Sequence, residues 1–219
     1  MVVVIIFSPL LYYVFNINYY LSLYEKNGVF EFVDRQDAIR LTEGLIGFLK
    51  DKEDFKPFIL KNNLSYFTTD EISHLGDVRI LFNKIFLTYY ICLGLTLIFI
   101  AVLFEKNIKN YLKNISVLLM LPSAILISLL LTLYFFGQNF LPLFDKFHLI
   151  FFPQGNFAFP EDSTLITLLP LNFFNDFFTR LVTSSLLFAA VLIITGAVIF
   201  IISKKFLKDR KLDDIPGRI

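Results

Sequence analysis

The sequence predicts an all-α polytopic membrane protein with four transmembrane helices and a small extracytoplasmic cap formed by two loops. Its 219 residues are 56% hydrophobic and only 18% charged, with a mean hydropathy of +0.68. Soluble domains are about 25% charged, so this composition argues against a soluble globular protein. Four long stretches contain no charged side chain. Each is long enough to cross a hydrocarbon core, which needs about 20 apolar residues of helix.

The charge-free stretches set the boundaries of the expected spans. The first is interrupted by Pro9, Asn16 and Asn18. It has neither a basic start nor a small-residue cleavage site, so we expect a membrane anchor rather than a signal peptide. The four expected spans are residues 1–24, 85–104, 115–136 and 181–203.

Basic residues predict the orientation of these spans. The segments 105–114 and 204–219 together carry nine basic and four acidic residues. The segments 25–84 and 137–180 together carry 11 basic and 15 acidic residues. Because Lys and Arg concentrate in cytoplasmic flanks, the first pair is expected in the cytoplasm and the second pair outside. The net charge of +1 gives no case for nucleic-acid binding.

The first outer segment contains two helix-start signals. Asp34 is a candidate N-cap for a helix that runs to about Lys52. Thr68 and Glu71 match a capping box, and the helix they start is expected to continue into the span at 85–104. Between these helices, residues 64–68 are a candidate short strand.

The second outer segment, residues 137–180, is rich in Phe and Pro and poor in charge. Proline breaks long helices. We therefore expect an irregular segment that lies in the interface or folds back onto the helices. The prolines concerned are Pro142, Pro153, Pro160 and Pro170.

Cys92 is the only cysteine, which excludes an internal disulfide and an iron–sulfur cluster. The main candidates for catalytic residues are the two histidines. His74 and His148 both fall in the expected outer segments, although a lone His at this level is most often passive. Asp77 shares a helix face with His74 and would orient its imidazole. Both histidines with Asp77 or Glu71 could bind zinc, but their spacing in the sequence does not match a known zinc-binding motif.

Two further residues have alternative interpretations. Ser163, next to Asp162, is a candidate nucleophile, but no Gly-x-Ser-x-Gly elbow surrounds it, and the favoured interpretation is that Asp162 or Ser163 caps the next turn. Arg79 either holds a phosphate or carboxylate or anchors its helix at the headgroup level.

Two outer segments carry a family resemblance. Residues 71–79 read Glu-Ile-Ser-His-Leu-Gly-Asp-Val-Arg, and residues 148–166 read His-Leu-Ile-Phe-Phe-Pro-Gln-Gly-Asn-Phe-Ala-Phe-Pro-Glu-Asp-Ser-Thr-Leu-Ile. With four spans and a short C-terminal tail, the chain resembles the bacterial lipoprotein intramolecular transacylase (Lit) family. The resemblance covers most of the chain.

The resemblance implies an O-to-N acyl transfer within one lipoprotein at the outer face of the bacterial cell membrane. The sn-2 acyl chain of a diacylglyceryl-cysteine moves to the α-amino group of the same cysteine, which gives a lyso-form lipoprotein. The expected partners are this lipoprotein and membrane lipid, and neither a metal nor another cofactor is expected. The Phe-rich residues 147–178 would form a wall for an acyl chain.

The resemblance also implies roles for residues. His148 would be the base that activates the amine, and His74 its partner as acid or oxyanion donor, oriented by Asp77 or Glu71. Further contacts to the oxyanion or the substrate backbone are expected from Gln154, Asn156 and Ser163, which equally suit turns and caps.

Two other functions remain open from the residues alone. A membrane sensor or assembly factor would use the outer loops to bind a partner, with incidental histidines. A lipase-like hydrolase would use Ser163 and His148 and release the acyl chain.

Overall fold

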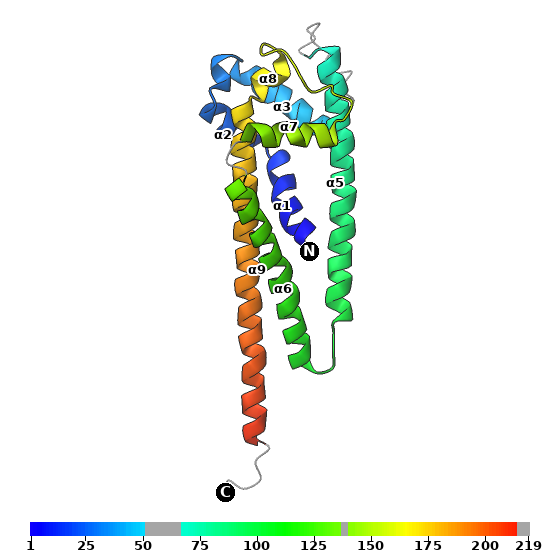
Figure 1. The fold of residues 1–219 in the computed structure, drawn as a ribbon, viewed down its shortest axis with the longest axis vertical. Coiled ribbons are helices and arrows are strands. Elements are labelled where there is room, and N and C mark those ends of the chain that lie inside the picture. Colours follow the sequence, from blue (N-terminus) through cyan, green and yellow to red (C-terminus); the bar gives the residue numbers. More distant parts are fainter. Residues whose placement is uncertain (51–66, 137–139, 214–219) are drawn as a thin grey trace. The chain divides into compact units, whose positions relative to one another are not determined.

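The computed structural model describes residues 1–50, 67–136 and 140–213, and within these ranges all regular structure is helical (Figure 1). The all-α fold class predicted from the sequence is confirmed. The chain divides into two compact units. The span unit comprises Met1–Phe7, Tyr89–Phe136 and Val182–Ile219, and the site unit comprises Ser8–Thr88 and Gly137–Leu181.

Three helices are long and apolar enough to cross a membrane: α5 (Thr69–Val102), α6 (Ile108–Phe136) and α9 (Leu171–Asp213). Each begins before the charge-free stretch that predicted it. In α5, that stretch begins at Ile85, so the first 16 residues of the helix precede the spanning segment.

The expected first span is broken. Helix α1 (Val2–Val14) and helix α2 (Ile17–Lys26) meet at a bend of 74°, and they make a fourth span only if the pair is one broken span. The break falls at Asn16, whose side chain accepts a hydrogen bond of 3.1 Å from the Asn18 N–H and so caps α2. Pro9 lies inside α1.

The span unit has a small buried core that contains Ile5, Leu126 and Ala189. A Cβ atom added to Gly196 of α9 would lie 2.6 Å from Met120 Cγ and 3.0 Å from the Ser116 carbonyl oxygen of α6. A side chain at position 196 would therefore require the Met120 side chain to move and the two helices to separate slightly.

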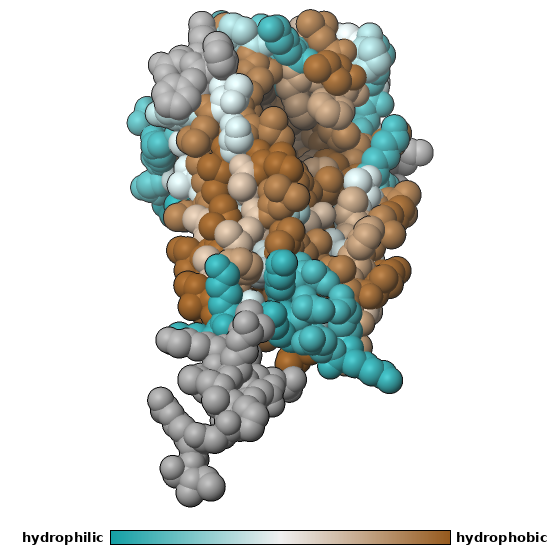
Figure 2. Space-filling view, turned by 60° about the horizontal axis from the view of Figure 1, so that its bottom comes forward, coloured by the Kyte–Doolittle hydropathy of each residue, from teal (hydrophilic) through white to brown (hydrophobic). Residues whose placement is uncertain are grey.

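Large apolar side chains cover the outer faces of the spanning helices (Figure 2). Soluble proteins rarely expose apolar patches of this extent, so these faces are suited to lipid. The chain is therefore a membrane protein. Examples are Leu97, Ile98 and Phe99 of α5, Leu121, Ile125 and Leu129 of α6, and Leu187, Val191 and Ile194 of α9, all between 49% and 64% exposed.

The site unit has its own core. Helix α3 (Arg35–Leu49) begins at the predicted cap, because Asp34 accepts hydrogen bonds from the N–H groups of Gln36 and Asp37. It ends at Leu49, just before the predicted end at about Lys52. Its buried face includes Leu41, Leu45 and Thr42, whose hydroxyl lies 2.8 Å from the buried Tyr24 hydroxyl.

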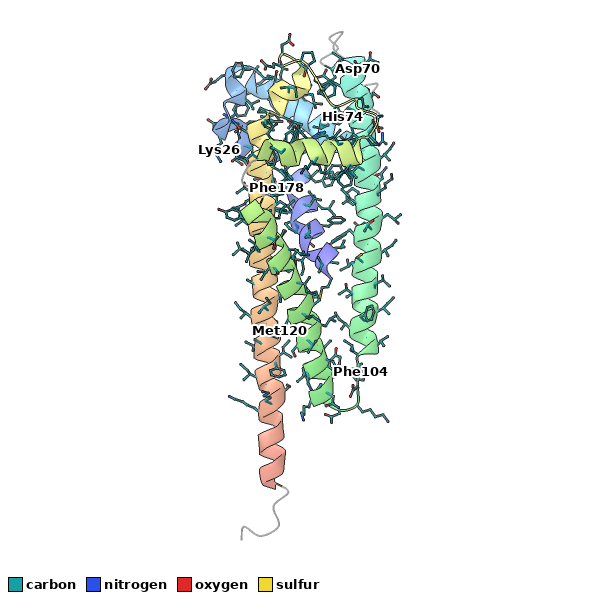
Figure 3. The ribbon with its side chains drawn as sticks, in the orientation of Figure 1. Lys26, Asp70, His74, Phe104, Met120 and Phe178 are labelled. Carbon is teal, nitrogen blue, oxygen red and sulfur yellow. The ribbon has the colours of Figure 1, made fainter. Side chains whose placement is uncertain are left out.

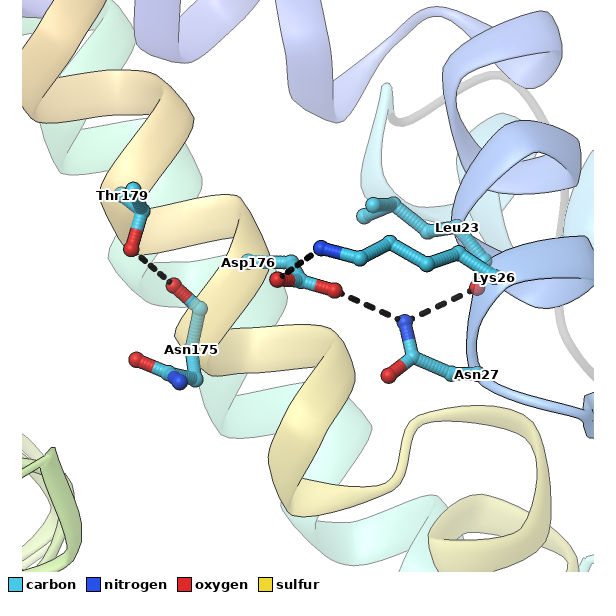
Figure 4. A network of polar contacts seen from close by, with 6 residues as sticks. All are labelled: Leu23, Lys26, Asn27, Asn175, Asp176 and Thr179. Atoms are coloured by element: carbon cyan, nitrogen blue, oxygen red, sulfur yellow. Dashed lines mark hydrogen bonds and ion pairs between the residues drawn. The ribbon is translucent and has the colours of Figure 1, made fainter.

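A polar network joins α2 to the first part of α9 (Figure 4). Lys26 Nζ lies 2.6 Å from Asp176 Oδ1, and Asn27 Nδ2 donates to Asp176 Oδ2 at 3.0 Å. The same Asn27 amide donates to the Leu23 carbonyl oxygen, so it also caps the end of α2. These contacts hold the end of α2 against the first part of α9 within the site unit.

The second outer segment forms two short helices, α7 (Phe140–Phe151) and α8 (Thr164–Leu168). Pro142 lies in the first turn of α7, Pro153 follows its end, and Pro170 directly precedes α9. These are positions where proline is compatible with helix starts and stops. The candidate strand at 64–68 lies mostly outside the described residues, and Phe67 and Thr68 are not in a strand.

Candidate active site

The structure brings the two histidines together within the site unit. His74 lies on α5 and His148 on α7, and their ring centroids are 6.0 Å apart with an angle of 25° between the ring planes. Both side chains are buried, with exposed fractions of 6% and 8%. Figure 3 marks His74 on the first turns of α5, before the spanning segment of that helix.

A local signal in the sequence positions His74. The predicted capping box at the start of α5 is present: Glu71 Oε2 accepts from the Thr68 N–H at 2.6 Å, and Thr68 Oγ1 accepts from the Glu71 N–H at 3.2 Å. It sets the first turn of α5, and His74 follows one turn later. His148 lies in the last turn of α7.

Phenylalanine rings surround the histidines. The centroid of the Phe152 ring lies 4.7 Å from that of His74 and 5.6 Å from that of His148, so Phe152 contacts both imidazoles. These rings shield the imidazoles from water, and most of them belong to the Phe-rich residues 147–178. The other neighbours are Phe159 at 5.6 Å from His74, and Phe144, Phe147 and Phe157 at 4.2, 5.5 and 5.0 Å from His148.

The hydrogen bond of His148 fixes its tautomer. Nδ1 lies 2.8 Å from the Phe144 carbonyl oxygen, and a carbonyl only accepts, so Nδ1 carries the proton. The lone pair of the neutral ring is then on Nε2. Burial lowers the pKa of His148 below its ordinary value of 6.5, although the Phe144 carbonyl and the charge of Asp145 act in the opposite direction. At neutral pH, His148 is an uncharged base.

Burial also lowers the pKa of His74, to about 4, and the nearby His148 contributes in the same direction. Asp77 and Asn156 oppose this shift without cancelling it. His74 is therefore a neutral imidazole at neutral pH. Its Nδ1 is buried and has no hydrogen-bond partner among the described residues.

Asp77 holds the loop that follows α7. Its Oδ2 accepts hydrogen bonds from Gln154 Nε2 and Asn156 Nδ2, both at 2.7 Å. The turn between these amides passes through Gly155, whose φ of +79° is a conformation that favours glycine. Asp77 therefore affects His74 through its charge, and it accepts hydrogen bonds from the side-chain amides of Gln154 and Asn156.

Three other predicted site residues lie in contacts that hold the backbone or a helix. Glu71 is fully buried, and its Oε1 accepts from the Leu165 N–H of α8 at 2.7 Å. Ser163 caps α8, with Oγ accepting from the Ile166 N–H at 3.3 Å. The Arg79 guanidinium lies 4.7 Å from the centre of the Phe48 ring.

Two features of the site were not predicted from the sequence. The first is the hydrogen bond between His148 and the Phe144 carbonyl. Because Phe144 precedes His148 by four residues, the spacing of a helix could have predicted this contact. The contact of Phe152 with both rings has no comparable signal. Within the described ranges, no group of three or more His, Cys, Asp and Glu side chains is arranged to hold a metal ion.

Comparison with known proteins identifies the family. Residues 1–174 match the model of the family described as lipoprotein intramolecular transacylase Lit. An uncharacterized protein from Aquifex aeolicus (strain VF5) is 31% identical over 185 residues, which are 81% of this chain and 78% of that protein. No solved structure matches the chain significantly. The chain belongs to the lipoprotein intramolecular transacylase (Lit) family and is a membrane enzyme that transfers an acyl chain within lipoproteins.

Proposed function

We propose that the enzyme moves the sn-2 acyl chain of a diacylglyceryl-cysteine lipoprotein to the α-amino group of the same cysteine, with His148 as the base. The observation that carries this proposal is the neutral His148 ring, with its lone pair on Nε2, 6.0 Å from a second buried imidazole. The pKa of an α-amino group is about 7.7–8.0. At neutral pH, a base with a lower pKa is therefore neutral while the amine is still largely protonated, so the base can accept the proton of the amine.

The transfer balances without a further reactant. His148 Nε2 accepts a proton from the α-ammonium group, and the amine nitrogen attacks the carbonyl carbon of the sn-2 ester. The new C–N bond forms as the C–O bond to glycerol breaks. One proton ends on the glycerol oxygen and another is released from the ammonium to solvent. The product carries an N-acyl group and a monoacylglyceryl thioether.

His74 acts in this scheme as a neutral hydrogen-bond donor to the oxyanion or to the leaving glycerol oxygen. A pKa of about 4 leaves few imidazolium cations at neutral pH, so a neutral N–H group is the more available donor. Donors in a dry, low-dielectric site stabilise developing charge more strongly than donors in water. The surrounding phenylalanines provide that environment and an apolar wall for the acyl chain.

The reaction takes place at the outer face of the bacterial cell membrane in this proposal. The segments 25–84 and 137–180, which contain both histidines, are then extracytoplasmic, and the basic segments 105–114 and 204–219 are cytoplasmic. Diacylglyceryl-cysteine is anchored by its acyl chains, so its amine and esters lie at the headgroup level.

The test uses a host that makes only diacylglyceryl lipoproteins. Expression of the protein is expected to yield lipopeptides with an N-acyl cysteine and a free glycerol hydroxyl, detected by mass spectrometry. His148→Ala is expected to lower the transfer rate by about 10²- to 10⁴-fold, and Ser163→Ala to retain transfer.

Three outcomes would contradict the proposal. Unchanged N-termini would favour a sensor or assembly factor. Loss of an acyl chain without N-acylation would favour a hydrolase. Transfer that survives His148→Ala would remove the base assignment.

A further inference from the structure

Both candidate catalytic imidazoles are covered by other parts of the site unit. His74 and His148 are 6% and 8% exposed, and phenylalanine rings lie against them. The proposed reaction requires contact between His148 Nε2 and the amine of a lipoprotein, which is a large substrate with two acyl chains and a peptide. Such a molecule cannot reach either ring while the whole cover stays in place, so part of the cover has to move.

One part of the cover lies in a segment that contains no helix. Residues 153–162 connect the end of α7 to the cap of α8. The centroid of the Phe157 ring lies 5.0 Å from that of His148, and the centroid of Phe159 lies 5.6 Å from that of His74. This segment therefore places one aromatic ring against each imidazole.

The backbone of this segment is less firmly held than the helices around it. Its backbone hydrogen bonds in the described structure stay within the segment and its two ends. A Cβ atom added to Gly155 would meet nothing within 4 Å, so the tip of the segment is not packed. Phe144, by contrast, lies on α7 and also contacts Phe174 of α9. Segments with few packed contacts open at a lower free energy than helices of the core, so residues 153–162 are the part of the cover that moves most easily.

Side chains provide the polar contacts of this segment with α5. Gln154 Nε2 and Asn156 Nδ2 each donate to Asp77 Oδ2 at 2.7 Å, and Asn156 Nδ2 also lies 3.4 Å from Ser73 Oγ. Asn156 is in addition one of the groups that act on the pKa of His74. Hydrogen bonds to a carboxylate are stronger than those between neutral groups. The covered state therefore depends on Asp77.

We propose that residues 153–162 form a lid over the two imidazoles and that the two amide hydrogen bonds to Asp77 are its latch, an inference that rests on the proposed function. The lid opens to admit the lipoprotein and closes once the amine and the ester lie beside the imidazoles. Phe157 and Phe159 then separate the reacting groups from water. Exclusion of water favours attack by the amine over hydrolysis of the ester.

The experiment measures how readily a small reagent reaches the imidazoles. Diethyl pyrocarbonate modifies neutral imidazoles, and mass spectrometry of peptides follows the two histidines of the chain separately. The purified wild type, with a tag that contains no histidine, is expected to react more slowly than a free histidine peptide. The rate follows the population of the open lid. Losing one hydrogen bond to a carboxylate raises that population by about tenfold, so Gln154→Ala is expected to react about tenfold faster.

Asn27→Ala is the matched control. Asn27 Nδ2 donates to Asp176 Oδ2 at 3.0 Å, so this variant also removes an amide–carboxylate hydrogen bond within the site unit, between α2 and α9 (Figure 4). It is expected to react at the wild-type rate. The inference is overturned if Gln154→Ala reacts no faster than the wild type, or if Asn27→Ala is accelerated to the same extent.

A reversible link tests the latch in the opposite direction. Asp77→Cys and Gln154→Cys are combined in a Cys92→Ser background and joined by a short bifunctional methanethiosulfonate. The reduced protein is expected to react at least as fast as Gln154→Ala and the linked protein as slowly as the wild type, with a reductant restoring the fast rate. A linked protein that still reacts fast contradicts the lid.

An ester-linked lipopeptide separates the two proposals. Linking is expected to stop acyl transfer, and transfer that proceeds equally well in the linked and reduced forms counts against the lid. A wild type that forms no N-acyl product contradicts the proposed function, whereas the modification rates still decide whether the lid exists.

Discussion

The tautomer of His148 leads to a prediction about pH at the scale of a single residue. The Phe144 carbonyl fixes the proton on Nδ1, and burial holds the pKa of the ring below 6.5. At saturating lipopeptide, kcat is expected to stay flat from about pH 8 to pH 6.5 and to fall at lower pH, as His148 becomes protonated. If the amine of the bound substrate instead had to lose its proton to solvent before it reacts, kcat would fall below about pH 7.7–8.0. A midpoint in that higher range would contradict the role of His148 as the base.

His74 leads to a second prediction at this scale. With a pKa of about 4, it works as a neutral donor, and glutamine also presents a neutral N–H group. His74→Ala is expected to lower kcat by about 10²- to 10³-fold, the usual effect of removing an oxyanion donor. His74→Gln is expected to recover part of that loss in a single-turnover transfer assay. Equal rates for the two variants would show that a neutral donor does not explain His74.

Glu71 leads to a prediction at the scale of secondary-structure elements. Its carboxylate joins the start of α5 to the start of α8 through the N–H groups of Thr68 and Leu165. Glu71→Ala leaves both N–H groups without this partner. The free energy of unfolding is expected to fall by about 1–3 kcal/mol for each N–H that stays buried and unpaired.

The measurement is thermal unfolding in detergent together with hydrogen exchange at the Leu165 amide. Asp70→Ala is the control, since Asp70 is an exposed neighbour in the same turn. We expect faster exchange at Leu165 in Glu71→Ala and unchanged exchange in Asp70→Ala. Protection that persists in Glu71→Ala would mean that α8 does not depend on this contact.

Elements whose signals are local were predictable, whereas their long-range partners were not. The Asp34 cap and the Thr68–Glu71 box each act within three residues, so a sequence pattern contains them. The contact of Glu71 with Leu165 spans 94 positions, and that of Asp77 with Asn156 spans 79. No local pattern specifies which loop folds onto α5, so the contact of Glu71 with the start of α8 was not predicted.

At the scale of the whole molecule, composition was enough to predict the fold class, because lipid-spanning helices require long stretches without charge. The bend of 74° between α1 and α2 could not be predicted in the same way. Asn16, Asn18 and Pro9 all interrupt the first apolar stretch, and the sequence does not show which of them breaks the helix. The proximity of the histidines also depends on the fold, since 74 positions separate them in the chain.

Orientation in the membrane is the prediction that concerns the whole chain. Nine basic residues in 105–114 and 204–219 favour a cytoplasmic location for these segments, which puts the histidines outside. Single cysteines at the exposed positions Asp70 and Lys106 test this in a Cys92→Ser background, which removes the native thiol. In intact cells, an impermeant maleimide is expected to label the Asp70→Cys variant at once. The Lys106→Cys variant should react only after permeabilisation. The reverse pattern would place the histidines on the cytoplasmic side, away from the diacylglyceryl-cysteine at the outer face, and the proposed reaction could not occur there.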